Sequence, residues 1–560
     1  MPAFARDQIR TALEKRVDAL SHGYRQNVGI IGALGLGKTH LLNSAFYDFT
    51  KRPGYICIFV QTEACDYEQL ADRWIGSVLT GFVFSEGQRT ASRRIEELIA
   101  FCEPLIPKTV HQIHLIKKTL RKEKGPVFIK ELFALPRILC EETGKKAVLM
   151  IEEFQELEKL PAPDPFALLG QEIMVEKDTM YIVSSSKPGR AKEIFRDKLS
   201  LLFGNFEVIE LRPFNFEETA DFLAFHFPRT QFSIQQLRFF ITLTDGEPLY
   251  LDLLLDRLKL YVSSQGEHIL SDALIFLSFQ EELLDRKGRL SLLFEKMLQP
   301  FLRTGKDGVP YLRTLLAVSE GYHRIPQIAA FIGRKTLETR KILSKLVMED
   351  MIKKQGSLYI IEDSLFEFWL QEVFNKRNQL FWPSDKIIEE ELYQTLREVL
   401  EKICHEEKKS YAGQIEKLLT EFRNDIVEID DRKCRCPHFT EVVKRDQGRF
   451  PVITAKTVNA RWLFQVAHDR VMEEDVLFFL EDIKKSRKKV LHKTMVLLGG
   501  IDQNARLMAQ AAKIQLWGLR DCNVLLSLHN LPKIIPIMEP GPGEQAFAEP
   551  EMSSPRQIVG

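Results

Sequence analysis

A glycine-rich segment near the N-terminus has the residue types and spacing of a phosphate-binding loop. It comprises Gly32, Ala33, Leu34, Gly35, Leu36, Gly37, Lys38, Thr39 and His40. The glycines let successive backbone N–H groups point at one anion, and a helix that begins at Thr39 adds its partial positive charge. Lys38 would reach the β and γ phosphates of a nucleotide, and the Thr39 hydroxyl would ligate Mg²⁺. The segment therefore predicts binding of ATP with Mg²⁺.

The residues on either side of this segment favour the same interpretation. Val28–Ile31 is a short apolar run typical of a buried strand, and residues 39–46 have helical periodicity. A phosphate-binding loop requires this order of strand, loop and helix. A glycine-rich turn that matches the pattern by accident is the alternative, and these flanking segments count against it.

Two adjacent carboxylates follow a later apolar run. Residues 147–151 read as a buried strand, and Glu152 and Glu153 come directly after it. Nucleotide hydrolysis needs one carboxylate to hold Mg²⁺ and a second to orient the attacking water, so we expect Glu152 in the first role and Glu153 in the second. The alternative is a pair of acids that begins a solvated helix. Glu152 has one methylene more than the aspartate usual at this position, which shifts the metal ligand and bears on turnover more than on binding.

Further polar residues could meet the terminal phosphate. Ser184, Ser185 and Ser186 end another apolar run, although serines there are also ordinary turn residues. Arg190 and Arg196 could supply positive charge as arginine fingers, and solvated surface arginines are the commoner alternative.

The elements that must position these residues alternate between strands and helices. Apolar runs at residues 28–31, 55–60, 147–151, 180–183 and 207–211 are separated by helical patterns. Continuous apolar strands of this kind predict an α/β fold with a parallel sheet covered on both faces.

The chain of 560 residues should form several domains, because single cores stop growing beyond roughly 250–300 residues. We expect a P-loop ATPase core at 1–214, a helical lid at 215–285, a winged helix at 286–382, a second small α/β domain at 383–535 and a disordered tail at 536–560. In the fourth range residues 387–422 read as helix, and strands are expected at 427–429, 462–467 and 494–498.

The composition excludes several classes of protein. The 78 Lys and Arg residues balance the 78 Asp and Glu residues, so no overall field attracts nucleic acid or anionic lipid. No apolar run reaches signal-peptide or membrane-span length, and we expect a cytoplasmic protein without a membrane partner. The 8 cysteines are scattered and should be reduced thiols. Cys434, Cys436 and His438, together with His405 or Cys404, leave zinc binding open, although their spacing is not the usual one.

These motifs together resemble the archaeal-type ATPase family, in the STAND branch of AAA+ proteins, over roughly residues 3–370. Phe4-Ala-Arg6-Asp7 is similar to the box of that family beside the adenine, with Ala5 and Asp7 as departures. Glu152-Glu-Phe-Gln155 is similar to its Walker B sequence. Gly246-Glu-Pro248 resembles its lid motif, which implies that Pro248 packs near the base and Arg6 beside it. Asn205 stands where the family often has an arginine.

A winged helix would add a surface for double-stranded DNA. Residues 324–333 read as its second helix, 336–351 as its recognition helix and 351–361 as a strand pair turned at Gln355–Gly356. Basic residues there could neutralise phosphates: Arg340, Lys341, Lys345, Lys353 and Lys354. Glu338, Glu349 and Asp350 count against it, and many winged helices contact proteins instead.

The second α/β domain resembles the restriction-endonuclease-like domain often joined to this family. Such nucleases use an acid followed by Glu-x-Lys on the next strand. Here Asp430 or Asp431 could be the first acid, but the matching tripeptide is Gln465-Val-Ala467. The basic run 484–489 is either a solvated helix end or a contact for a nucleic-acid backbone. We expect no nuclease activity from this domain.

Two functional hypotheses follow. In the first, the chain is an ATPase that acts as a nucleotide-dependent switch on DNA, with a protein partner that the sequence does not identify. In the second, it is a DNA-binding or scaffold protein in which ATP is a structural ligand with little turnover.

Overall fold

The structure is a computed structural model in which the chain forms two compact units. The first comprises Met1–Phe214 and Glu247–Tyr250, and the second comprises Asn215–Gly246 and Leu251–Gly560. The structure describes residues 6–62, 66–88, 92, 94–122, 127–160, 164–199, 206–265, 270–302, 308–379, 385–406, 410–429, 432–446, 448–458, 460–485, 490 and 492–536. Several predictions fall on residues outside these ranges: Phe4, Ala5, Asn205, Asp430, Asp431, 486–489 and 537–560.

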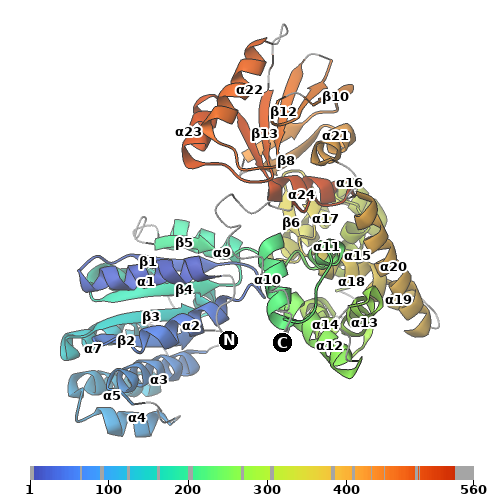
Figure 1. Ribbon diagram of the computed structural model, residues 1–560. Helices are drawn as coiled ribbons and strands as arrows, with labels where there is room; N and C mark the ends of the chain where they lie inside the picture. Colours follow the sequence, from blue (N-terminus) through green and yellow to red (C-terminus); the bar gives the residue numbers. More distant parts are fainter. Residues whose placement is uncertain are drawn as a thin grey trace, which may run out of the picture. The chain divides into compact units, whose positions relative to one another are not determined.

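The first unit contains a five-stranded sheet in the order β2-β3-β4-β1-β5, with every neighbouring pair parallel (Figure 1). Its strands are β1 (Asn27–Ile31), β2 (Tyr55–Gln61), β3 (Lys146–Glu152), β4 (Thr179–Ser185) and β5 (Phe206–Glu210). The five apolar runs of the sequence form these five strands, and the predicted α/β fold with a parallel sheet is confirmed. Their carboxyl ends lie at one edge of the sheet, where Glu152, Ser186 and the glycine-rich segment follow them.

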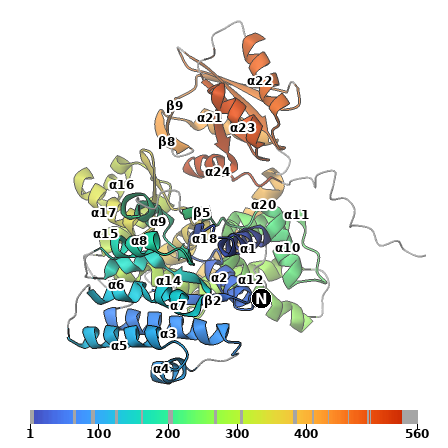
Figure 2. The same cartoon turned by 90° about the vertical axis from the view of Figure 1, so that its left-hand side faces the viewer.

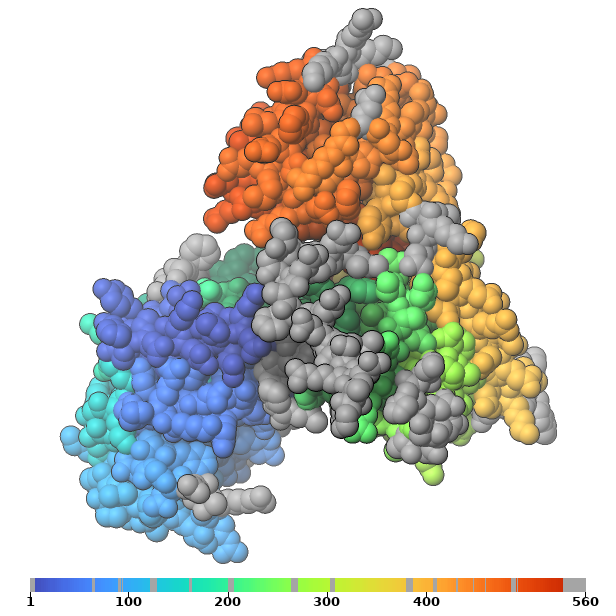
Figure 3. All heavy atoms as spheres, in the orientation of Figure 1, coloured from blue at the N-terminus to red at the C-terminus, as the bar shows by residue number. Residues whose placement is uncertain are grey.

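Helices cover both faces of this sheet. One apolar cluster joins Leu13, Val17 and Leu41 to inward residues of β1 and β3. A second cluster joins Trp74 and Leu132 to the opposite face. The helices are α1 (Asp7–Ser21), α2 (Lys38–Phe49), α3 (Tyr67–Ser85), α4 (Ile95–Cys102), α5 (Pro107–Lys122), α6 (Val127–Phe133), α7 (Leu135–Thr143), α8 (Pro165–Val175) and α9 (Pro188–Glu193). In the space-filling view the blue atoms of the N-terminal part of the chain form one packed body (Figure 3).

The second unit begins with helices. They are α10 (Phe216–His226), α11 (Ile234–Thr244), α12 (Pro248–Gln265), α13 (Asp272–Leu284), α14 (Arg289–Leu302), α15 (Val309–Ser319), α16 (Ile325–Ile332) and α17 (Thr336–Met348). A hairpin of β6 (Lys353–Gln355) and β7 (Leu358–Ile360) follows, turned at Gly356, and the helices α18 (Ser364–Trp369), α19 (Lys376–Gln379), α20 (Asp385–Glu406) and α21 (Tyr411–Glu421) come next. The helix expected over 387–422 is therefore two helices, and Ser410 caps the second by accepting a hydrogen bond from the Gly413 N–H at 3.2 Å.

A second five-stranded sheet lies in the C-terminal part of the described chain (Figure 2). Its order is β10-β11-β12-β13-β14, antiparallel between β10, β11 and β12 and parallel from β12 onward. A separate hairpin of β8 (Asp425–Ile429) and β9 (Arg432–Cys436) precedes it. The other elements are β10 (Glu441–Arg445), β11 (Val452–Lys456), β12 (Arg461–Ala467), α22 (Glu473–Lys485), β13 (His492–Leu497), α23 (Gln503–Ala511), β14 (Gln515–Gly518) and α24 (Leu519–Leu528). The expected strands 427–429, 462–467 and 494–498 are present, whereas β9, β10, β11 and β14 were not predicted.

The chain after α24 returns to the turn that follows α11. Lys533 Nζ donates to the carboxylate of Asp245 and to the Ser364 hydroxyl, and the Ser364 N–H donates to Asp245 at 3.1 Å. Asp245 has a left-handed backbone, with φ of 54°, and is the last residue but one before the chain crosses into the first unit at Glu247. Glu367 lies near this cluster, where burial raises its pKa to about 8 against the opposing charge of Lys533.

Glu367→Gln is expected to stabilise the second unit at alkaline pH. The folded-state pKa lies above the usual value of 4.5, so the folded protein holds this proton more tightly than the unfolded chain does. The stabilisation from the protonated carboxyl is complete below pH 4.5 and is lost as the pH rises through about 8. Glutamine keeps the neutral form at every pH. Thermal unfolding above pH 8 should therefore occur at a higher temperature in the variant, and the difference should shrink toward pH 4.5. Glu398→Gln, at an exposed position on α20, is the matched control. An effect of Glu367→Gln that is equal at both pH values would contradict the assignment.

Candidate nucleotide-binding site

The glycine-rich loop joins β1, which lies between β4 and β5, to α2. Gly35 and Gly37 have φ of 93° and 83°, in the left-handed region that side chains disfavour. Gly37 is the N-cap of α2 and provides no side chain to cap it. The first N–H groups of α2 have no partner within the helix, so they and the helix dipole favour an anion at this end.

The segment Glu247–Tyr250 lies against this loop within the first unit. A Cβ atom at Gly35 would stand 2.5 Å from Glu247 Oε1 and 3.0 Å from Leu249 Cβ. Only glycine fits there without displacing the segment, which includes Pro248. The structure thus brings residues separated by more than two hundred positions to one side of the loop.

Lys38 is buried beneath the loop, with 5% of its surface exposed. Its ammonium donates to the carbonyl oxygens of Gly32 and Ala33 at 2.8 and 2.7 Å. Burial lowers the pKa of Lys38, and the negative charges of Glu153, Glu247 and Glu152 oppose this effect. Among the described residues no carboxylate lies within ion-pair distance of the ammonium. A phosphate oxygen would provide this cation with a direct anionic partner.

Thr39 and Glu152 form the pair of oxygens expected at the metal. The Thr39 hydroxyl donates directly to Glu152 Oε1, although the two residues are 113 positions apart. Gln61 Nε2 donates to the other oxygen, Oε2, at 2.9 Å. Glu152 is also buried, with 6% of its surface exposed. Burial and these two hydrogen bonds together hold the carboxylate in place. Oxygen ligands of this kind fit Mg²⁺. Thr39 and Glu152 would hold the ion.

Glu153 lies beside Glu152 but points at a different partner. Its backbone is left-handed, with φ of 54°, at the point where β3 ends. Its Oε2 accepts hydrogen bonds from the Ser186 N–H at 2.9 Å, the Ser186 hydroxyl at 2.7 Å and Gln155 Nε2 at 2.7 Å. The Thr62 hydroxyl donates to the carbonyls of both glutamates, at 2.8 and 2.7 Å. The carboxylate is thus hydrogen-bonded and held at the carboxyl end of β4.

Other predicted residues are placed differently. The guanidinium of Arg6 donates to the Arg212 carbonyl at 2.6 Å and lies over the Phe214 ring at 5.1 Å. Arg190 is bound by the carboxylates of Glu158 and Glu193, and Arg196 by that of Asp197 at 2.7 Å. Both arginines expected as possible fingers are therefore engaged by acids of their own chain. Of the three serines Ser186 reaches Glu153, whereas Ser184 and Ser185 are buried. Ala33, Leu34 and His40 are exposed along the loop.

Sequence reasoning missed Gln61, Thr62 and Glu247 as contributors to this site. Gln61 and Thr62 end β2 and meet β3 only because those two strands pair, with Gln61 opposite Glu152. The sequence did contain a signal for these two residues, because Gln61 and Thr62 are a polar pair directly after the apolar run 55–60. Glu247 stands inside the Gly246-Glu-Pro248 motif, so its position was noted but its charge was not used.

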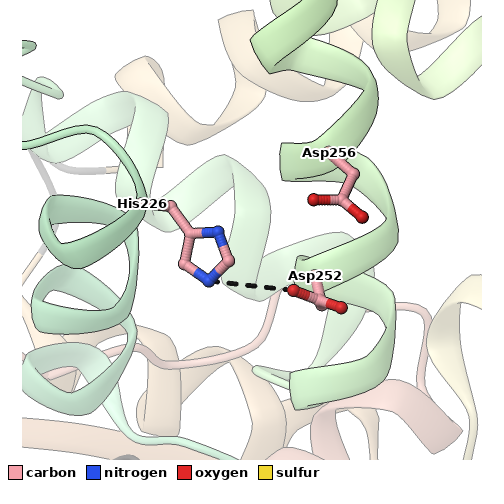
Figure 4. Close-up of side chains that lie close together, drawn as sticks. All are labelled: His226, Asp252 and Asp256. Carbon is pink, nitrogen blue, oxygen red and sulfur yellow. Dashed lines mark ion pairs between the residues drawn. The ribbon is translucent and has the colours of Figure 1, made fainter. Parts of the chain in front are cut away.

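A separate cluster lies in the second unit. His226 on α10 faces Asp252 and Asp256 on α12 (Figure 4), with one ligand atom of each within 4.8 Å of the others. Lys259 Nζ lies 2.7 Å from His226 Nδ1, and Arg289 pairs with Asp256 at 3.2 Å. These cations already occupy the cluster. Within the described part of the chain it is the one such group, so Cys434, Cys436 and His438 do not assemble a zinc site there.

Comparison with known proteins places this chain among distant structural neighbours. No protein-family model matches it, and no curated protein matches it. Among solved structures, the Walker-type ATPase paby2304 of Pyrococcus abyssi has 16% identity, covers 66% of this chain and 96% of its own, and has a TM-score of 0.46. The ORC2 protein of Aeropyrum pernix, solved with ADPNP and ADP, has 12% identity, covers 70% and 94%, and has a TM-score of 0.41. The ORC1 protein of Aeropyrum pernix, solved with DNA, has 12% identity, covers 67% and 94%, and has a TM-score of 0.36.

No helix within the described ranges is long and apolar enough to cross a membrane. The roles of individual residues come from the geometry of this chain alone.

Proposed function

We propose that this protein binds ATP with Mg²⁺ in the loop of residues 32–40 and hydrolyses it as a nucleotide-dependent switch that acts on DNA. One observation carries the proposal. The Thr39 hydroxyl on the loop after β1 donates to Glu152 at the carboxyl end of β3, and the charges of Glu152 and Glu153 act on Lys38, which is the arrangement that phosphoryl transfer needs.

Each residue has a separate role. The N–H groups at the start of α2 and the Lys38 ammonium bind the phosphates. Thr39 and Glu152 hold Mg²⁺, which when bound neutralises negative charge on the phosphates. Glu153 orients the attacking water and accepts its proton. Glu247 and Pro248 lie against the loop, so nucleotide binding acts directly on the segment where the chain passes between its two units.

The alternative function, with ATP as a structural ligand, is favoured by one specific observation. Three donors already bind Glu153 Oε2, so this oxygen is engaged by Ser186 and Gln155. While Ser186 holds this carboxylate, Glu153 is not available to the attacking water. The protein therefore hydrolyses ATP slowly until Ser186 releases Glu153. Hydrolysis measured with the protein in excess over labelled ATP separates the two functions, because a switch completes one turnover whereas a structural site retains the ATP.

We further propose that residues 286–382 form a winged helix. The helices α15, α16 and α17 and the β6–β7 hairpin occur in the required order. We also propose three further domains: an ATPase core at 1–214, a helical lid at 215–285 and an α/β domain at 383–535. The partner protein is not identified by any of these elements.

For the last of these domains we propose a restriction-endonuclease-like fold that has lost its catalytic residues. Gln465 on β12 lies opposite Val452 on β11, so neither strand offers a carboxylate at this position. Ala467 follows on the same strand. Asp430 and Asp431 fall between β8 and β9, which form their own two-stranded sheet and not the sheet that contains Gln465. A metal nuclease needs carboxylates to hold its ion, and neither β11 nor β12 contains a carboxylate.

The purified protein is therefore expected not to cleave nucleic acid. Supercoiled plasmid incubated with the protein, Mg²⁺ or Mn²⁺ and ATP should remain supercoiled over a time in which a restriction enzyme linearises it. Gel electrophoresis measures the outcome. Metal-dependent nicking that disappears in Asp430→Ala or Asp431→Ala would instead identify a working nuclease.

A further inference from the structure

The β6–β7 hairpin packs against the β8–β9 hairpin. The Ser357 N–H donates to the Ile426 carbonyl at 2.9 Å, and Gln355 Nε2 donates to the Glu428 carbonyl. Leu358 and Ile360 belong to the same apolar cluster as core residues of the C-terminal sheet. The tip of this hairpin is therefore joined to β8 along the backbone.

Two further contacts hold the hairpins together. Gly356 at the turn has φ of 66°, and a Cβ atom there would stand 2.3 Å from the Ile426 carbonyl oxygen. Arg324, at the start of α16, binds Asp425 with both nitrogens, at 2.7 to 3.0 Å, and the Asp425 side chain is 8% exposed. Bidentate pairs of this kind are strong and directional. The turn at Gly356 is consequently not free to enter a groove of DNA.

Exposed basic residues lie on both sides of this junction. They are Arg340 and Lys341 on α17, Lys354 on β6, and Lys433 and Arg435 on β9. Among the described residues none of them is in an ion pair, whereas Lys353 pairs with Glu362 at 2.7 Å and Arg334 with Glu338 at 3.3 Å. Unpaired cations that flank a fixed junction favour a polyanion there.

The strand register gives the side of β9 on which its cations lie. Lys433 is opposite Glu428, and Arg435 is opposite Ile426, which is 44% exposed. Val427 and Cys434 alternate with them and face the core. On the other side of the junction, Lys354 is opposite Tyr359, whose hydroxyl lies near the positive charge of Arg340. On the outward face of β8 the carboxylate is Glu428. Its single negative charge does not neutralise the two positive charges of Lys433 and Arg435.

We propose that duplex DNA binds across this junction and contacts α17 through Arg340 and Lys341 and β9 through Lys433 and Arg435, without insertion of the β6–β7 turn. The C-terminal domain thus supplies part of the DNA surface. This inference rests on the proposed action on DNA but not on ATP hydrolysis. Phosphate contacts of this kind give affinity without sequence specificity and make it dependent on salt.

The test compares two double variants of the full chain in binding to a labelled DNA duplex at increasing salt. The helix variant is Arg340→Ala with Lys341→Ala, and the hairpin variant is Lys433→Ala with Arg435→Ala. Each should weaken binding roughly tenfold or more and should reduce the slope of log affinity against log salt by about two units. Exchanging the two hairpin cations, as Lys433→Arg with Arg435→Lys, should retain the slope.

A control removes equal charge elsewhere in the same unit. Lys402→Ala with Arg506→Ala changes exposed positions on α20 and α23, and its binding should match that of wild type. Thermal unfolding checks that each variant is folded, and ATP binding is measured in parallel. Wild-type affinity and slope in the hairpin variant, a preference for duplex RNA, or no salt-dependent binding by wild type would each overturn the proposal. Wild-type DNA binding by the hairpin variant contradicts this inference alone, whereas absence of DNA binding or of ATP binding in the wild type contradicts the proposed function as well.

Discussion

Lys38→Ala is expected to abolish ATP binding while the protein remains folded. The ammonium of Lys38 is the buried cation of the loop, and its described contacts are the carbonyls of Gly32 and Ala33. Removing one partner of a buried charged contact costs about 2–5 kcal/mol, which corresponds to roughly one to four orders of magnitude in affinity. Isothermal titration calorimetry with ATP and Mg²⁺ measures the loss.

Stability should change little, because alanine removes a cation whose burial lowers its pKa and which makes no direct ion pair among the described residues. Lys15→Ala, at an exposed position on α1, is the matched control and should bind ATP as wild type does. Equal affinities of Lys38→Ala and wild type, with both proteins folded by circular dichroism, would refute the phosphate-binding role of the loop.

Glu153→Gln is expected to retain ATP binding and to lose hydrolysis. Glutamine can accept the hydrogen bonds of Ser186 and Gln155 through its carbonyl oxygen, so the local structure should survive. It cannot accept a proton from water, and loss of a positioned base typically lowers the rate by about 10²–10⁴-fold. Single-turnover hydrolysis of labelled ATP measures the rate, and calorimetry measures the retained affinity.

The control for this variant is Glu156→Gln, which removes the same charge three residues along the chain. Glu156 pairs with Lys159 and has no described contact with Glu152 or Ser186. Its hydrolysis rate should equal that of wild type. If wild type and Glu153→Gln hydrolyse ATP at the same residual rate, the structural-ligand function is correct and the switch is wrong.

The local sequence was sufficient to predict the loop and the strands of the first unit. A strand, a glycine-rich turn and a helix occupy neighbouring residues, and the left-handed φ values at Gly35 and Gly37 are those that only glycine adopts readily. The same holds for Glu152 and Glu153, because an apolar run of five residues ends directly before them. In such cases the residues that determine the structure and the residues that do the chemistry are the same few neighbours.

Two strands of the C-terminal part of the chain, β9 and β10, were harder to predict for a physical reason. β10 alternates between exposed and half-buried residues, so it has little apolar signal, and β9 consists of basic residues alternating with cysteines. Such short, polar strands are stabilised by their pairing partners, and periodicity alone does not reveal them.

What the sequence by itself determined is the glycine-rich loop between strand and helix, the adjacent carboxylates and the α/β class, since each depends on contacts between near neighbours in the chain. The tertiary structure alone decided the partners of those groups. Gln61 reaches Glu152 because β2 pairs with β3, Ser186 reaches Glu153 because β4 lies beside β3, and Arg324 reaches Asp425 across 101 positions. The order of strands in a sheet and the docking of one domain on another depend on the packing of the whole unit, which no local pattern contains.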